Sequence, residues 1–121
     1  MSFSVLMVVG DRKGRVGVGL GKATDVTSAM RKASSYAQRH LITVPMRGST
    51  IPHEIRVKVG AARIIIKPAP PGTGVIAGGA VRAVVEAAGI RDIVSKILGT
   101  KNRASNVHAT FEALKQLRQI V

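Results

Sequence analysis

A thirteen-residue segment that combines glycine with positive charge constrains this chain more than any other part of it. Residues 10–22 contain five glycines and four cations and follow the apolar run 5–9. Glycine lacks a Cβ, so it adopts turn and bulge conformations at low cost and lets another backbone approach closely. Guanidinium and ammonium groups bind phosphate oxygens well. The segment predicts a hairpin of two strands, 3–9 and 15–20, with a basic turn that suits a polyanion. An ordinary hairpin with solvated charges is the alternative.

Net charge is the second constraint. The 121 residues include 19 lysines and arginines against 6 acidic residues, which gives a net charge of +13. This length suits one ordinary domain or two small ones, and so basic a protein repels itself unless a polyanion neutralises it. The cations are spread along the chain, and no apolar run approaches the length of a membrane span. These observations favour nucleic acid over a membrane as the partner.

Aromatic residues are scarce, which limits how nucleic acid is held. Only Phe3, Tyr36 and Phe111 occur, whereas proteins that bind unpaired bases usually stack them on several exposed aromatic rings. Phe3 and Phe111 lie in apolar patterns and are expected in the core. The sequence therefore predicts contacts with the nucleic-acid backbone and shape, and little base stacking.

The first half of the chain predicts a helix packed on the hairpin. Thr24 or Asp25 provides an N-cap, because either side chain can accept a hydrogen bond from a free backbone N–H group. Apolar residues at helical spacing predict the buried face: Val26, Ala29, Met30, Ala33, Ala37 and Leu41. Residues 41–46 predict another short strand. The turn-rich segment 47–50, followed by Pro52, predicts a boundary between two subdomains.

The second half predicts strands and helices in alternation. Residues 55–59 and 63–67 read as strands, and the proline- and glycine-rich segment 68–74 reads as a rigid loop. A helix is expected to begin at Gly78-Gly79 and to run to about Ala88, with Gly89 as its C-cap. A strand at 90–98 and a basic turn at 99–103 follow.

A last helix is expected near the end of the sequence. Ser105 or Asn106 is its predicted N-cap. Its buried stripe is predicted from helical spacing: Val107, Phe111, Leu114, Leu117 and Val121.

Catalytic and metal-binding motifs are absent from the sequence. A phosphate-binding Walker loop fails, because Ala23 follows Gly21-Lys22 and Val16 stands where the first glycine belongs. The three histidines show no metal-ligand spacing, no serine sits in a nucleophile elbow, and cysteine is absent. We therefore expect no enzyme, no metal, no cofactor and no small-molecule substrate.

One glycine segment imitates a dinucleotide-binding fingerprint. Residues 72–77 match Gly-x-Gly-x-x-Gly/Ala, and Asp92 lies twenty residues beyond Gly72, near the distance of a ribose-binding acid. The prolines within 68–71 make the turn too long, however, and Asp92 stands at the start of the next strand instead of its end. A small nucleotide-dependent enzyme built on this segment is the weaker alternative.

Several segments together resemble the small-subunit ribosomal protein five family. They cover most of the chain: residues 8–11, 14–23, 50–54, 67–69, 72–80, 109–110, 114–115 and 117. The resemblance implies an α+β fold of two small α/β subdomains. Residues 1–49 would form an N-terminal sheet with one helix, similar to a double-stranded-RNA-binding domain (dsRBD-like). Residues 50–121 would form a C-terminal βαβα domain.

The resemblance also implies two structural peculiarities. The family has an upstream strand and a basic Gly-Arg loop that do not precede Phe3 here, so the first domain is expected to lack its first strand. The C-terminal domain of the family carries a left-handed βαβ crossover, against the usual right-handed rule.

The partners implied by the resemblance are small-subunit rRNA, the neighbouring ribosomal proteins four and eight, and the region where mRNA enters. Support of subunit assembly and decoding accuracy is implied as well, in a cytoplasmic or organellar ribosome. The residues expected to bind rRNA are glycines and cations: Arg12, Lys13, Gly14, Arg15, Gly17, Gly19, Gly21, Lys22, Arg47, Arg56, Lys58, Arg63, Lys101 and Arg103. A protein contact is expected at Gly72, Thr73, Gly74 and Arg82. A free-standing module that binds double-stranded RNA outside the ribosome is the alternative.

Overall fold

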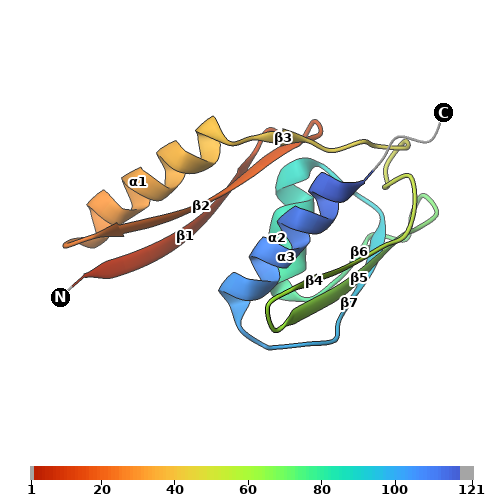
Figure 1. Ribbon diagram of the computed structural model, residues 1–121. Helices are drawn as coiled ribbons and strands as arrows, with labels where there is room; N and C mark the ends of the chain where they lie inside the picture. The colour runs from red at the N-terminus through yellow and green to blue at the C-terminus, as the bar shows by residue number, and fades with distance from the viewer. Residues whose placement is uncertain (1, 118–121) are drawn as a thin grey trace.

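The computed structural model describes residues 2–117, which form two sheets and three helices in an α+β arrangement (Figure 1). The first sheet has the order β1-β2-β3 and consists of β1 (Phe3–Gly10), β2 (Arg15–Ala23) and β3 (Ile42–Thr43). β1 and β2 are antiparallel, with Phe3 opposite Ala23 and Gly10 opposite Val16. The predicted hairpin is confirmed.

Helix α1 (Val26–Arg39) covers one face of the first sheet (Figure 1). Asp25 is its N-cap, and one carboxylate oxygen accepts a hydrogen bond of 2.7 Å from the backbone N–H of Ser28. This hydrogen bond lowers the pKa of Asp25. The strand predicted at 41–46 shrinks to two residues. The Val44 N–H still donates to the Gly14 carbonyl, but the next residue, Pro45, has no N–H to continue the pairing.

The glycines of β2 face this helix, which corrects one expectation. Gly17, Gly19 and Gly21 are buried, and a Cβ on any of them would collide with a backbone carbonyl oxygen of α1. An rRNA backbone therefore cannot approach this face, because α1 occupies it. Gly14 is buried as well, in the turn between the two strands.

The contact with these glycines also narrows the buried face of α1. Only three alanines of the predicted stripe are buried: Ala29, Ala33 and Ala37. Val26, Met30 and Leu41 were wrongly predicted as buried, since their side chains are 47%, 44% and 36% exposed. A helix that lies directly on a glycine strand needs only small residues along the line of contact, so its larger apolar residues lie outside that line.

The second sheet has the order β4-β5-β7-β6. It contains β4 (Ile55–Val59), β5 (Ala62–Pro68), β6 (Val75–Ile76) and β7 (Ile93–Ile97). β4, β5 and β7 are antiparallel neighbours, whereas β6 runs parallel to β7. The predicted strands are confirmed, although β7 is shorter than 90–98 and the two-residue β6 was not predicted. The handedness of the crossover between β6 and β7 stays a prediction.

Helices α2 (Gly79–Ala88) and α3 (Arg103–Gln116) pack against each other and against the second sheet (Figure 1). Gly89 caps α2 in the left-handed conformation at φ +92°, as predicted. The N-cap of α3 is Asn102 and not Ser105 or Asn106, because the Asn102 side chain accepts the Ser105 N–H at 3.0 Å.

The hydrophobic core lies mainly between the second sheet and its helices, and β2 extends it. Its large members include Ile64, Ile66, Ile93, Val84 and Leu114. Val16 and Val18 from β2 join the same cluster, so the face of β2 opposite α1 is buried against the second half of the chain. The boundary predicted between residues 49 and 50 stays a prediction.

The predicted burial of the two phenylalanines and of the apolar stripe on the last helix is only partly correct. Phe3 is 40% exposed at the open end of the hairpin, where it pairs with Ala23. Phe111 is partly buried against the core, and Leu117 is buried. Val121 lies outside the described residues.

Candidate nucleic-acid interface

The basic turn between β1 and β2 is shaped by one carboxylate. Oδ1 of Asp11 accepts hydrogen bonds from the backbone N–H groups of Lys13 (2.8 Å) and Arg15 (3.0 Å), and Oδ2 accepts one from Arg15 Nε (3.0 Å). These interactions, led by the Arg15 side chain, lower the pKa of Asp11 to about 2. The resulting tight turn places Arg12 at φ +58° and Gly14 at φ +105°.

This turn is docked on the C-terminal end of α2. The Arg12 N–H donates to the Ala87 carbonyl (3.0 Å), and the Gly14 N–H donates to the Ala88 carbonyl (2.8 Å). Gly89 permits the approach, since a Cβ there would overlap the Arg12 carbonyl. The C-terminal end of a helix carries partial negative charge, which favours cations nearby. The fold therefore fixes the backbone of the turn and leaves its cationic side chains exposed.

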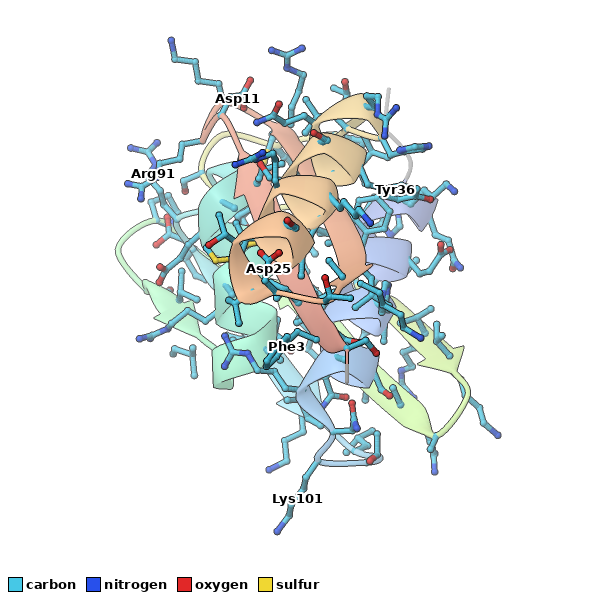
Figure 2. All side chains as sticks on the ribbon, turned by 90° about the vertical axis from the view of Figure 1, so that its left-hand side faces the viewer. Phe3, Asp11, Asp25, Tyr36, Arg91 and Lys101 are labelled. Atoms are coloured by element: carbon cyan, nitrogen blue, oxygen red, sulfur yellow. The ribbon has the colours of Figure 1, made fainter. Side chains whose placement is uncertain are left out.

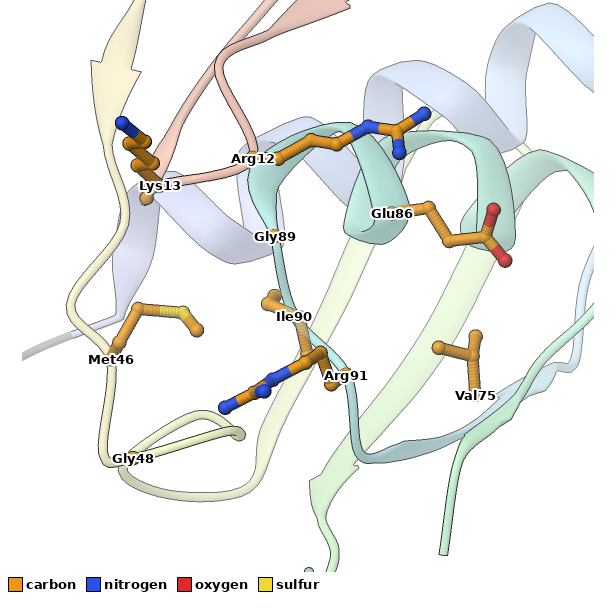
Figure 3. A pocket seen from close by; sticks show the side chains of 10 residues that line it. Arg12, Lys13, Met46, Gly48, Val75, Glu86, Gly89, Ile90 and Arg91 are labelled. Atoms are coloured by element: carbon orange, nitrogen blue, oxygen red, sulfur yellow. The ribbon is translucent and has the colours of Figure 1, made fainter. Parts of the chain in front are cut away.

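A cleft of about 750 Å³ opens beside this joint (Figure 3). Arg12 and Lys13 line it from the turn, and Arg91 lines it from the segment after α2. Glu86 also lines the cleft, but its carboxylate lies 3.6 Å from Arg82 Nε, so an ion pair offsets its charge. We name the three exposed cations Arg12, Lys13 and Arg91 the joint cluster.

Arg91 was missed by sequence reasoning. It lies nearly eighty residues from Arg12 in the chain, and no motif marks it. Only the docking of the turn on α2 brings the two arginines to one cleft, so no local signal was available to find it.

The other predicted cations of the first half do not line the cleft of the joint cluster. Arg15 is 58% exposed but paired with Asp11. Lys22 stands opposite Ser4, at the far end of the hairpin, where its carbonyl accepts a hydrogen bond from Lys32 Nζ at 3.2 Å. Arg47 is exposed in the turn closed by the bridge between Arg47 and Thr50. Lys22 therefore lies far from the turn that carries Arg12, Lys13 and Arg15.

A second basic surface covers the outer face of the second sheet. Arg56, Lys58 and Arg63 are exposed there, and Lys58 stands directly opposite Arg63. Lys67 and Lys96 share this face by strand alternation and register but were not predicted. We name these five cations the basic sheet face.

Glu54 partly neutralises the basic sheet face. Its Oε1 lies 3.8 Å from both Arg56 Nη2 and Lys67 Nζ, and all three side chains are well exposed. Such exposed pairs contribute little to stability, so most of the positive charge of this face remains available to a partner.

Lys101 and Arg103 form a separate pair at the opposite end of the second half. Both line a shallow cleft of about 420 Å³ beside Gly79 and Ala80, at the N-terminal end of α2. The structure does not bring them to the joint cluster.

The glycine segment that imitates a nucleotide fingerprint is held by Asp92. Asp92 is only 5% exposed, and its Oδ1 accepts hydrogen bonds from the N–H groups of Gly72 (3.1 Å) and Gly74 (2.8 Å). Hydrogen bonds from the Ser49 side chain, Gly74 and Gly72 lower the pKa of Asp92. A pyrophosphate would need those same N–H groups. Asp92 therefore anchors the loop, and it does not serve as a ribose-binding acid.

The predicted protein-contact residues are neighbours in space. Gly72 and Gly74 take φ of +93° and +82°, and Thr73 Oγ1 donates to the Pro70 carbonyl at 2.8 Å. Arg82 joins them from α2, because its Nη2 donates to the Val75 carbonyl at 2.7 Å. The loop and the first turn of α2 thus form one exposed, ordered surface.

Within residues 2–117, histidine, aspartate and glutamate side chains form no group of three that could hold a metal ion. No helix in the described part combines the length and apolar character needed to cross a membrane.

Comparison with known proteins gives one consistent result. A family model described as the N-terminal domain of ribosomal protein S5 matches residues 1–45, and one described as its C-terminal domain matches residues 57–121. The small ribosomal subunit protein uS5 of Thermus thermophilus is 55% identical over 116 residues, which cover 96% of this chain and 72% of that protein. The uS5 protein of a Chloroflexus aurantiacus strain is 51% identical over 119 residues, covering 98% of this chain and 67% of that protein.

Proposed function

The chain belongs to the ribosomal protein S5 family of the small ribosomal subunit, and from this premise we propose that it clamps folded rRNA. It does so through phosphate contacts and has no catalytic role. The net charge of +13 and the exposed cations on two separate surfaces support this function. Phosphate contacts fix the position of a protein on nucleic acid without reading its sequence.

The joint cluster is the observation that carries the proposal. Arg12 and Lys13 extend from a turn whose backbone is held by Asp11 on one side and by the α2 carbonyls on the other. Arg91 joins them from the second half of the chain. Cations on a rigid support lose little backbone freedom when they bind, so RNA phosphates are bound at a low entropic cost. The basic sheet face supplies a second set of phosphate contacts.

Neighbouring proteins of the small subunit are proposed to contact the surface formed by Gly72, Thr73, Gly74 and Arg82. This proposal is supported by the hydrogen bonds that hold the surface in place. Asp92 binds the loop and the Val75 carbonyl binds Arg82, while the surface remains exposed. The family resemblance makes ribosomal proteins four and eight the expected neighbours. It also implies a location in the ribosome near the region where mRNA enters, and a part in subunit assembly and decoding accuracy.

A matched pair of double variants tests the clamp. The chain contains Arg-Lys twice on exposed surface, at 12–13 in the turn and at 31–32 on α1. Binding to a small-subunit rRNA transcript is measured by filter retention across a range of salt concentrations for R12A/K13A and for R31A/K32A. We expect R12A/K13A to reduce the slope of log affinity against log salt by about 1.5 and to weaken binding to all RNA sequences alike. R31A/K32A removes the same charges and should change the slope far less.

Two results would contradict the clamp. Equal effects of the two double variants would show that only net charge matters, and a flat salt response of the unmodified protein would rule out phosphate contacts. Sedimentation of cell extract separates a subunit protein from a free-standing double-stranded-RNA module, because only the former comigrates quantitatively with small subunits.

A further inference from the structure

The fold gathers most of the aromatic rings of the chain into one groove. The groove has a volume of about 390 Å³ and lies between α1 and α3, with Val18 of β2 and Ile42 of β3 at its floor. Tyr36 and His40 line it from α1, and His108 and Phe111 line it from α3. The sequence contains only three Phe and Tyr residues in all, so two of them meet here.

Tyr36 and His40 already form a stacked platform. Their ring centroids are 3.9 Å apart and their planes are inclined by 17°. His40 Nδ1 donates to the Tyr36 carbonyl at 2.8 Å, which fixes the imidazole ring. Tyr36 is 46% exposed, and Figure 2 shows it on the flank of α1 that is turned toward α3. A prearranged and accessible pair of rings can take a further flat ring by stacking at little entropic cost.

The opposite wall offers polar groups on one face of α3. His108, Glu112 and Lys115 follow helical spacing, so their side chains lie along the groove together. Within residues 2–117, neither Glu112 nor Lys115 forms an ion pair or a side-chain hydrogen bond. The groove therefore combines an aromatic surface with a hydrogen-bond acceptor and a cation that no other described residue engages.

We propose that this groove holds one unpaired RNA base, stacked on the Tyr36–His40 platform. Glu112 accepts hydrogen bonds from an exocyclic amino group of that base, and Lys115 contacts an adjacent phosphate. A volume of 390 Å³ lies within the range of about 300–1,000 Å³ in which small-ligand sites fall. The proposal rests on the proposed rRNA binding and adds a base-stacking subsite to it.

A carboxylate acceptor predicts a choice between pyrimidines. Cytosine presents an amino group at C4, whereas uracil presents a carbonyl oxygen that a carboxylate repels. The two bases have the same ring size and stack similarly. Pentacytidylate should therefore bind more tightly than pentauridylate, and E112Q, which keeps the shape but removes the charge, should narrow the difference.

The single tyrosine makes the test direct, since its ring resonances in an NMR spectrum need no further assignment. We expect pentacytidylate to shift the Tyr36 ring protons upfield, as stacking does. We expect Y36A to weaken binding of the small-subunit rRNA transcript about 5- to 150-fold, given the usual worth of one stacked base. Y36F keeps the ring and should bind normally. F3A removes a similarly exposed ring at the far end of β1 and should leave affinity unchanged.

The outcomes separate the subsite from the clamp. If the transcript binds with strong salt dependence but Y36A binds as tightly as the unmodified protein, the subsite is wrong and the clamp stands. If Tyr36 resonances do not move with either pentanucleotide, the subsite is likewise wrong. If Y36A weakens comigration with small subunits but not RNA affinity, the groove holds a protein side chain and the proposal is overturned. Retained circular dichroism of Y36A, together with the shifts in the unmodified protein, guards against misfolding as the cause.

Discussion

The two sheets of this molecule meet their helices in opposite ways. In the first half, α1 lies directly on the backbone of β2, where Gly17, Gly19 and Gly21 face three alanines. In the second half, large side chains such as Ile66 and Leu114 fill the space between the sheet and α2 and α3. The first contact is backbone against backbone, and the second is side chain between side chains.

The two contacts are stabilised by different interactions. Glycine and alanine bury little apolar area, so the contact of α1 depends on close dispersion contacts and contributes little by the hydrophobic effect. The first half compensates with the other face of β2, because Val16 and Val18 enter the core of the second half. An added atom should therefore destabilise the contact between α1 and β2. A removed atom should destabilise the contact of the second sheet with α2 and α3.

The largest effect is expected from adding one methyl group to the first contact. The Cβ of Gly19→Ala would collide with the Ala33 carbonyl, where backbone faces backbone and neither side can move alone. We expect the free energy of unfolding to fall by about 4 kcal/mol, a loss typical of severe core defects. Urea unfolding followed by circular dichroism measures it. Gly60→Ala is the control, because no atom lies within 4 Å of that Cβ and only its φ of +57° resists the change.

A slightly smaller effect is expected from removing atoms in the second contact. Ile66→Ala leaves a cavity at a fully buried position between the sheet and the helices. Such truncations cost about 2–5 kcal/mol, and we expect about 3 kcal/mol here. The same urea titration applies. If Gly19→Ala proved harmless while Ile66→Ala did not, the first contact would be looser than the close approach of its backbones indicates.

The next smaller loss of stability is expected at the joint between the two halves, where the basic turn docks on α2. In Gly89→Ala, a Cβ would meet the Arg12 carbonyl, and the residue would have to adopt φ +92°. Overpacking of this kind costs about 1–3 kcal/mol, and the basic turn would be displaced from α2. We expect reduced rRNA affinity together with reduced stability. If affinity measured by filter retention stayed normal in the folded variant, the docking of the turn would not matter for binding.

The smallest effect concerns the carboxylate that shapes the turn. The pKa of Asp11 is about 2 in the folded protein against 3.8 in an unperturbed one. A lowered folded pKa means that ionised Asp11 stabilises the protein fully above about pH 4 and that this contribution disappears as the pH falls toward 2.

The variant Asp11→Asn tests this assignment through the melting temperature. The unmodified protein should melt higher than the variant near neutral pH, and the two values should converge between about pH 4 and pH 2. Asp25 and Asp92 titrate in both proteins, so the difference isolates Asp11. A difference that stays constant through this range would show that Asp11 does not titrate with a lowered pKa.

Much of the secondary structure could be predicted because its causes are local. The hairpin, a cap at Thr24 or Asp25 (Asp25 in the structure) and the C-cap at Gly89 follow from residue types and their immediate neighbours. Predictions failed where a distant segment intervened. Met30 is 44% exposed because α1 meets the glycines of β2. The cap of α3 failed for a local reason instead, because the Asn102 side chain accepts the Ser105 N–H.

By itself, the sequence determined the order of the strands and helices apart from the two-residue β6, the excess of positive charge and the family. Periodicity, turn residues, charge and motifs are all carried by short segments. The tertiary structure alone decided that the glycines of β2 face a helix instead of RNA, and that Arg91 joins Arg12. It also decided that Tyr36 faces α3. These contacts join segments that are far apart in the sequence. They are set by close packing between the segments, which no local pattern of residues encodes.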